Sequence, residues 1–339
     1  MHSKNLKQGH PALLFTGIIV ILILSIIIST CMGRYPLPVS DLFRYIFTGE
    51  ANDPTLSTIL LNVRLPRILG ALLTGGVLAI AGATYQGIFR NPMVSPDILG
   101  ISSGAGFGAA LAILFSFNIF GIQLLAFAFG LGAVSLSYFI SRVLGKNNDT
   151  ILMLVLAGMV ISSLFGAFLS LIKYVADPDS KLPAITFWLM GSLSSLTLKD
   201  ILNILPSLTL GLVPLFLVGW RLNVLSFGED EAKTLGVNTN RLRLVVIVAS
   251  SLVTASIVSI TGLIGWVGLI IPHFARFIIG PDHQKLLPFS FLLGALFMLW
   301  VDNISRSATT LEIPIGIITA IIGAPFFLLF LARTSNKSF

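Results

Sequence analysis

Charged side chains are scarce in this sequence. Asp, Glu, Lys and Arg together account for 10% of the 339 residues, whereas apolar residues account for 55%, and the mean hydropathy is +0.96. A soluble domain carries about 25% of its residues as charges. The composition therefore excludes a soluble globular domain and indicates a chain that lies mostly within a membrane.

The sequence also lacks the common catalytic and metal-binding motifs. Cys31 is the only cysteine, so the chain can form neither an internal disulfide nor a cysteine-based metal site. It contains no G-x-x-x-x-G-K-[ST] phosphate loop, no H-E-x-x-H motif and no nucleophile elbow. We therefore expect this chain to be no enzyme, and to bind no metal and no cofactor itself.

Long apolar segments dominate what is present. A transmembrane helix needs about 20 apolar residues, and each such segment must be helical because lipid cannot satisfy free backbone groups. The predicted spans are 13–32, 67–89, 98–117, 119–140, 151–174, 200–220, 244–261, 263–279, 286–302 and 314–332. We therefore predict an all-α polytopic membrane protein, with about ten transmembrane helices in a single domain over residues 1–339.

The basic residues predict the orientation. An even number of spans places both termini on one side of the membrane, and thirteen of the 21 Lys and Arg residues fall on that side. The positive-inside rule makes that side cytoplasmic. Topology thus explains the formal net charge of +7 without a nucleic-acid partner.

The first apolar segment has some features of a cleaved signal sequence. Lys4 and Lys7 precede it, and Cys31 ends it as in a lipoprotein leader. However, Thr30 is a poor residue before that cleavage site, and the run of nearly twenty residues is long for a signal peptide. We therefore expect an uncleaved first transmembrane helix.

A polar segment over residues 221–243 separates two spans on the cytoplasmic side. Ser226 is a candidate N-cap, and Glu229 stands at the capping-box position three residues later. Lys233 lies four residues after Glu229, and Gly236 would end the helix. The pattern predicts a short, stiff cytoplasmic helix that faces a partner.

Three arginines lie at the predicted outer ends of spans. Arg64 and Arg67 flank the start of the second span, and Arg306 follows the ninth. Helix-end arginines often only extend their charge to the interface, but three together could also dock an acidic partner surface. Both interpretations stay open. Asp302 and Glu312 bracket Arg306 and are expected to be neutralised there.

The second span carries many glycines and one buried amide near its inner end. Glycines such as Gly82 predict close helix packing. Gln86 lies one turn inside the membrane, where it could line a pathway or bond a neighbouring helix, and both readings stay open. Asn91 and Pro92 form the tight inner turn that follows.

The stretch 261–276 is unusual because three glycines and Pro272 interrupt apolar sequence. It predicts a short or broken helix, and such helices often flank transport paths. His273 has no nearby carboxylate, so a packing or hydrogen-bonding role is favoured over a proton relay. The candidate pathway or gating residues are Gln86, Asn91, Pro92, Gly265, Gly268, Pro272 and His273.

Six sequence blocks together resemble one family, the FecCD family of ABC importer permeases, which take up iron–siderophore complexes, haem or vitamin B12. The blocks are Arg64-Leu-Pro-Arg67, Gly82 to Pro92, Trp188-Leu-Met-Gly-Ser192, Gly228 to Gly236, Gly268 to Arg276, and Glu312 to Gly316 leading to Gly323-Ala-Pro325. The resemblance covers nearly the whole chain.

The resemblance implies a type II ABC importer permease fold in a bacterial inner or plasma membrane. It implies a second permease subunit, two cytosolic ATPase subunits that bind ATP-Mg, and an extracytoplasmic binding protein docked on Arg64, Arg67 and Arg306. It assigns ATPase coupling to Ser226, Gly228, Glu229, Asp230, Ala232, Leu235 and Gly236. We expect an iron(III)-siderophore permease, with haem or vitamin B12 as alternative ligands. The rival of another class, an ion-coupled secondary transporter, would need intramembrane acids that the sequence lacks.

Overall fold

A computed structural model of the chain describes residues 11–33, 35, 38–48, 54–145 and 150–335. All regular structure in those ranges is helical. The elements are α1 (Pro11–Cys31), α2 (Val39–Thr48), α3 (Pro54–Thr58), η1 (Ile59–Arg64), α4 (Leu65–Phe89), η2 (Pro96–Leu99), α5 (Ile101–Leu114), α6 (Ile119–Leu144), α7 (Thr150–Val175), α8 (Lys181–Leu189), α9 (Leu198–Leu217), α10 (Gly219–Leu225), α11 (Glu229–Thr234), α12 (Thr239–Thr261), α13 (Val267–Ile279), α14 (His283–Ser307) and α15 (Ile315–Ser335).

Ten of these helices match the ten predicted spans. Within the described residues, seven helices (α1, α4, α6, α7, α9, α12 and α14) are long and apolar enough to cross a membrane. Three shorter apolar helices, α5, α13 and α15, account for the other predicted spans. The polytopic all-α prediction is confirmed.

Two predicted spans start too early. The eighth span was predicted from residue 263, but α13 begins at Val267, because Gly262 and Trp266 adopt φ values of +71° and +72° that a helix cannot accommodate. The third was predicted from residue 98, but α5 begins at Ile101 after η2. The prediction of a short or broken helix around Pro272 is confirmed.

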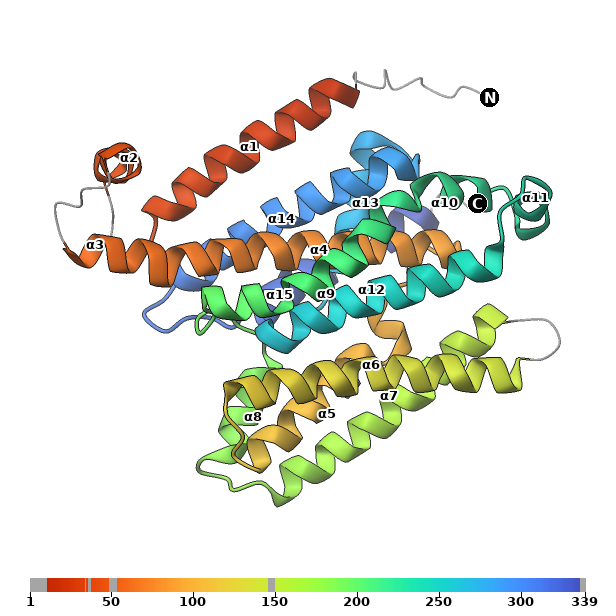
Figure 1. The fold of residues 1–339 in the computed structure, drawn as a ribbon, viewed down its shortest axis with the longest axis horizontal. Helices are drawn as coiled ribbons and strands as arrows, with labels where there is room; N and C mark the ends of the chain where they lie inside the picture. Colours follow the sequence, from red (N-terminus) through yellow and green to blue (C-terminus); the bar gives the residue numbers. More distant parts are fainter. Residues whose placement is uncertain (1–10, 34, 36–37, 49–53, 146–149, 336–339) are drawn as a thin grey trace.

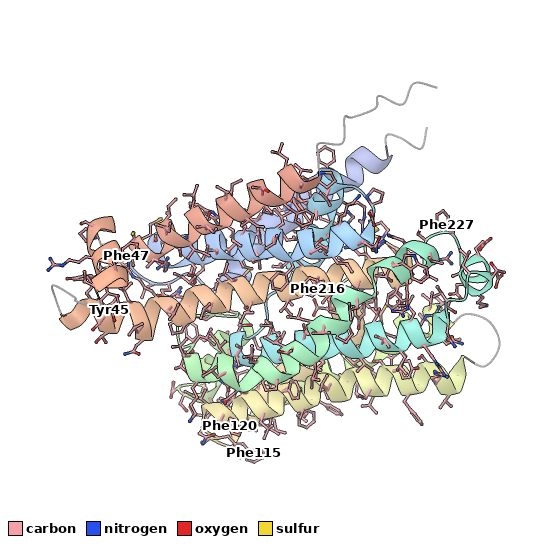
Figure 2. All side chains as sticks on the ribbon, turned by 45° about the horizontal axis from the view of Figure 1, so that its top comes forward. Tyr45, Phe47, Phe115, Phe120, Phe216 and Phe227 are labelled. Atoms are coloured by element: carbon pink, nitrogen blue, oxygen red, sulfur yellow. The ribbon has the colours of Figure 1, made fainter. Side chains whose placement is uncertain are left out.

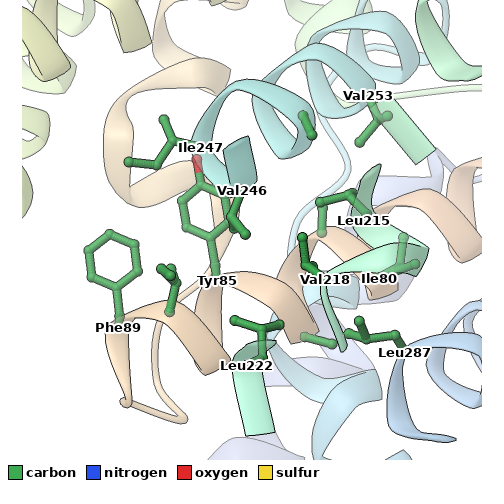
Figure 3. Close-up of a cluster of buried hydrophobic side chains, with 14 of the residues drawn as sticks. Ile80, Tyr85, Phe89, Leu215, Val218, Leu222, Val246, Ile247, Val253 and Leu287 are labelled. Atoms are coloured by element: carbon green, nitrogen blue, oxygen red, sulfur yellow. The ribbon is translucent and has the colours of Figure 1, made fainter. Parts of the chain in front are cut away.

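Helices α4 and α12 form the centre of the bundle (Figure 1). Side chains of α4 are buried along almost its whole length, whereas α1, α6, α7 and α9 expose most of their surface. Figure 3 shows part of the main core cluster, in which Tyr85 of α4 lies beside Val246 and Ile247 of α12. This distribution places α4 inside the bundle and the other four helices at its periphery.

Glycine contacts bring α4 close to two neighbours. A Cβ atom added at Gly75 would lie 1.9 Å from the carbonyl oxygen of Gly294 on α14. One added at Gly82 would lie 1.8 Å from that of Gly268 on α13. Any larger residue would therefore force these backbones apart. The packing role predicted for the glycines of this span is confirmed at both crossings.

The two ends of the bundle carry different elements. Helices α10 and α11 lie at one end, and α1 begins there too; α2, α3 and α8 lie at the opposite end (Figure 1). We call these the α11 end and the α2 end. The connection between α1 and α4 contains α2, α3 and η1.

Candidate functional site: the two ends of the bundle

Helix α11 is the short polar helix that the sequence predicted, but its start differs. Its N-cap is Gly228, whereas Ser226 ends α10 and its hydroxyl donates a hydrogen bond to the Asn223 carbonyl at 2.6 Å. Glu229 is consequently the first helical residue and cannot form the predicted capping box with Ser226. Gly236 ends the segment with φ +82°, as predicted.

The ion pairs that hold α11 differ from the pair that the sequence spacing suggested. Glu229 was expected to pair with Lys233, but Lys233 pairs with Asp230 at 3.1 Å. Glu229 instead accepts from the Arg243 guanidinium on α12 at 2.5 Å, and that arginine is buried. Ala232 is fully buried on the inner side of α11. The helix is therefore anchored to the bundle through α12.

The outer side of α11 presents both charge and apolar surface. The side chain of Asp230 is 91% exposed, and Phe227 and Leu235 are also largely exposed. Figure 2 shows Phe227 beside α11 at the tip of the molecule. Exposed aromatic surface next to charged residues is typical of a protein-binding patch. Sequence reasoning missed Phe227, although a large aromatic residue in a polar segment was a readable signal.

The side-chain amide of Asn223 connects α10 to α14 at the α11 end, and we call this contact the joint. The Asn223 side chain donates to the Asp282 carboxylate at 2.7 Å and accepts from the His283 backbone N–H at 2.7 Å. Asp282 is also the N-cap of α14. Movement of the α10–α11 segment is thus tied to α14. The joint was not predicted, because its partners lie about 60 positions apart in sequence.

Several predicted pathway residues cross-link α4 to α13. Gln86 donates to the Leu269 carbonyl at 3.1 Å and accepts from Arg276 at 3.2 Å. His273 and the Pro92 carbonyl are 2.8 Å apart. Of the two readings left open for Gln86, the structure shows the bond to a neighbouring helix, and the hydrogen-bonding role favoured for His273 is confirmed.

The structure brings some of the pathway candidates together and separates others. Gln86, Asn91, Pro92 and Ser226 line one cavity of about 280 Å³ at the α11 end. Gly268 lies instead at the α4–α13 crossing, Pro272 is buried inside α13, and Gly265 lies in the connection before it. A pathway role for any of them stays a prediction.

The three arginines predicted for docking do lie together at the α2 end, but they are buried. Arg64, Arg67 and Arg306 are only 4–6% exposed. Arg64 donates to the Thr30 and Tyr35 carbonyls, and Arg306 donates to the Ser29 carbonyl at 2.6 Å. Two arginines thus cap the last turn of α1, where helical carbonyls lack partners.

A buried ion-pair network connects Arg67 of α4 to α14, which carries both Asp302 and Arg306. Arg67 pairs with Asp302 at 2.6 Å and with Glu312 at 2.9 Å, and Arg306 lies 3.5 Å from Asp302. Glu312 was expected to neutralise Arg306, but it neutralises Arg67. Two carboxylates face three guanidinium groups, so the cluster keeps an excess positive charge. A cavity of about 220 Å³ borders all three arginines. Their docking role stays a prediction.

No group of three or more His, Cys, Asp or Glu side chains within the described residues could hold a metal ion.

Known proteins resemble this chain over nearly its full length. The FecCD transport family matches residues 21–333. The chain is 44% identical to the molybdate import system permease protein MolB of Haemophilus influenzae, over 94% of this chain and 95% of that protein. It is 45% identical to the probable iron chelatin transport system permease protein of Helicobacter pylori, over 83% and 84%.

A solved structure shows the same architecture. It is an ABC transporter assigned to the metal-chelate type, in an inward-facing conformation, with a TM-score of 0.86 and 43% identity over 96% of this chain and 100% of that one. The structural match therefore agrees with the sequence matches, and it covers nearly the full length of both chains. The chain belongs to the FecCD transport family and is a membrane-embedded permease subunit of an ABC importer, with no enzymatic role of its own.

Proposed function

We propose that this permease imports an iron(III)-siderophore complex by ATP-driven alternating access, with the whole chain acting as one permease domain. Relatives named for iron chelate, haem and iron(III)-citrate import support a ferric ligand. Relatives named for molybdate and cobalamin import define the competing ligands.

Helix α11 is the observation that carries the mechanism. It projects from the bundle, exposes Phe227 and Leu235, and is anchored by Glu229 to Arg243. A short helix that is held by an ion pair can transmit a displacement to the rest of the bundle, whereas an unanchored loop would change its own conformation instead. We therefore assign α11 as the contact for an ATPase subunit that binds ATP-Mg, and place the α11 end, with both termini, in the cytoplasm.

The joint between Asn223 and Asp282 extends this contact into the membrane. Closure of two ATPase subunits would shift α11 and, through this joint, α14. Helix α14 carries Asp302 and Arg306 at the α2 end. A rigid-body shift of this kind is a recognised route between two conformations. A second permease subunit, the same chain or a similar one, would complete the path.

The α2 end is the proposed docking face for a binding protein. Arg64 is the best candidate for that contact, because within the described part of the chain its guanidinium group bonds only to backbone carbonyls and makes no ion pair. A carboxylate from a partner could therefore pair with it without breaking an existing ion pair. Arg67 and Arg306, which lie in the same cluster, would add positive charge near that contact.

Uptake in cells tests the ligand. A strain lacking this chain should fail to accumulate a labelled ferric siderophore, and the wild-type gene should restore uptake. Arg64→Glu should abolish uptake while the ATPase subunits still co-purify with the permease. Loss of haem, cobalamin or molybdate uptake instead would assign that ligand and exclude the siderophore.

Energy dependence tests the class of transporter. In proteoliposomes that contain the assembled complex, ATP on the ATPase side should drive import without any ion gradient. Import driven by a proton or sodium gradient in the absence of ATP would show a secondary transporter and refute the proposal.

A further inference from the structure

A hollow of about 500 Å³ lies at the α2 end, between α8 and the junction of α5 with α6. Its position is separate from the arginine cluster, with which it shares no lining residue. Ligand sites for organic molecules enclose roughly 300–1,000 Å³. The hollow therefore has room for a chelate, and a bare oxyanion would fill only a small part of it.

Hydroxyl groups from separate segments converge on the hollow. They belong to Ser116, Ser180, Ser192, Ser194, Ser195 and Thr261. The Ser195 hydroxyl has no hydrogen-bond partner among the described residues, and the Ser192–Ser194 pair at 2.9 Å has one hydroxyl hydrogen to spare. These groups can donate to the oxygen atoms of a bound ligand.

Lys181 supplies the charge of the hollow. It is the only charged side chain among the described residues that line it. Its ammonium group donates to the neutral Ser116 hydroxyl, and Ser116 is held at an uncommon φ of +57°. The nearby Asp177 is already occupied by hydrogen bonds from Ser180 and Asp179, which lower the pKa of its carboxyl group, and the Lys181 charge adds to this effect. The hollow therefore offers a ligand one ammonium group together with spare hydroxyl donors.

Aromatic and aliphatic side chains form the rest of the wall. Four of the lining residues, Ile113, Phe117, Phe187 and Trp188, present apolar side chains to the space. A fully hydrated inorganic anion gains little from such a wall, whereas an organic body buries apolar area against it.

The floor of the hollow is structurally fixed. The Ser192 backbone N–H donates to the Thr261 carbonyl at 2.8 Å, and the Ile315 and Gly316 N–H groups donate to the Gly191 and Met190 carbonyls. Three segments distant in sequence thus meet beneath it. A site held in this way can keep its hydroxyl groups in place while other helices move.

We propose that this hollow binds an anionic metal–organic chelate as it passes through the permease, with Lys181 facing ligand oxygens and Trp188 packing on the organic body. The inference rests on the proposed import function and adds to it a binding site for the ligand within the permease. The size and apolar walls of the site favour such a chelate over a bare oxyanion such as molybdate.

Import by the complete transporter tests this assignment. We would assemble the permease with its ATPase subunits and binding protein in proteoliposomes, and use radiolabelled ferric dicitrate, a ferric tricatecholate and molybdate as probes. Lys181→Gln should reduce import of the ferric chelate about tenfold at limiting ligand, as expected for the loss of one charge-assisted hydrogen bond. Lys181→Arg should retain import, and Trp188→Ala should lower it.

Two measurements separate this role from a structural one. ATP hydrolysis stimulated by the binding protein should be unchanged in Lys181→Gln, which shows that the complex still assembles. Lys199→Gln is the matched control, because Lys199 is exposed at the same end and does not line the hollow.

Three outcomes would overturn the assignment. Wild-type import of molybdate without import of either chelate would do so while leaving the importer function intact. Equal import by the wild type, Lys181→Gln and Trp188→Ala would also overturn the assignment. So would loss of complex assembly in Trp188→Ala, because the hollow would then be a subunit interface. Failure of the wild type to import any of the probes with ATP would instead refute the proposed function itself.

Discussion

Replacement of Arg67 by methionine should destabilise the α2 end strongly. Methionine keeps much of the apolar stem of Arg67 but removes the guanidinium group. Arg67 is 6% exposed and its partner Asp302 is fully buried, 2.6 Å away. The change leaves Asp302 with only Arg306, at 3.5 Å. Glu312 is 31% exposed and can be hydrated instead, so the cost falls mainly on Asp302.

The expected cost is about 3–5 kcal/mol, the usual penalty for leaving a buried charge without its partner. That is a large share of a typical folding free energy of about 5–15 kcal/mol. The double change Arg67→Met with Asp302→Asn removes the orphaned charge as well. It should therefore recover at least half of the loss, because neutral replacements of a buried pair are much less costly.

Thermal and denaturant unfolding of the purified chain in detergent measures these effects. Arg44→Met is the matched control, since Arg44 is exposed at the same end and should change stability by less than about 0.5 kcal/mol. A loss below about 1 kcal/mol for Arg67→Met, or a double variant as unstable as the single one, would refute the reasoning. Either result would show that the Arg67–Asp302 pair does not hold α4 and α14 together.

Three further changes test other parts of the structure. Ala232→Pro places proline in the buried face of α11 and should uncouple ATP hydrolysis from import. The measurement is the amount of ligand imported per ATP hydrolysed. An unchanged ratio would exclude α11 as the contact for the ATPase. Asn223→Ala removes the joint to Asp282 and should lower the same ratio without loss of ATPase binding, whereas Asn118→Ala, which removes an N-cap at the α2 end, should not. Gly82→Ala should reduce the yield and melting temperature of the purified chain, because the added Cβ atom would meet the Gly268 carbonyl. Gly166→Ala is the control and should be tolerated, because no atom lies within 4 Å of the added Cβ. Equal yield and melting temperature of the two variants would contradict the packing argument.

Local sequence was sufficient wherever one chemical requirement dominates. The spans could be predicted because lipid demands long apolar helices, and the glycine-rich face of α4 predicted close packing because only small residues permit it. The short helix before Gly236 could be predicted from its charges and its stop signal. Its first residue could not, because Ser226 sits close enough to α10 to finish that helix instead.

Predictions failed where a residue had several possible partners. Glu229 could pair with Lys233 one turn away, but the Arg243 guanidinium on α12 is closer in space. Glu312 could neutralise Arg306, but Arg67 receives it. Sequence spacing ranks partners along a helix, whereas long arginine side chains reach across helices, so only the packing determines which pair forms.

The sequence by itself determined that this protein crosses a membrane about ten times, that it carries a short polar helix between two of its spans, and that it resembles an importer permease. Only the tertiary structure decided which face of α11 is exposed, that Asn223 joins α10 to α14, and that the three arginines at the α2 end are buried, two of them in ion pairs. It alone brought Lys181, Trp188 and the serines around one hollow. The reason is physical: transfer into lipid depends on each segment's own composition, but charge pairing and cavities depend on residues that meet only after the helices have packed.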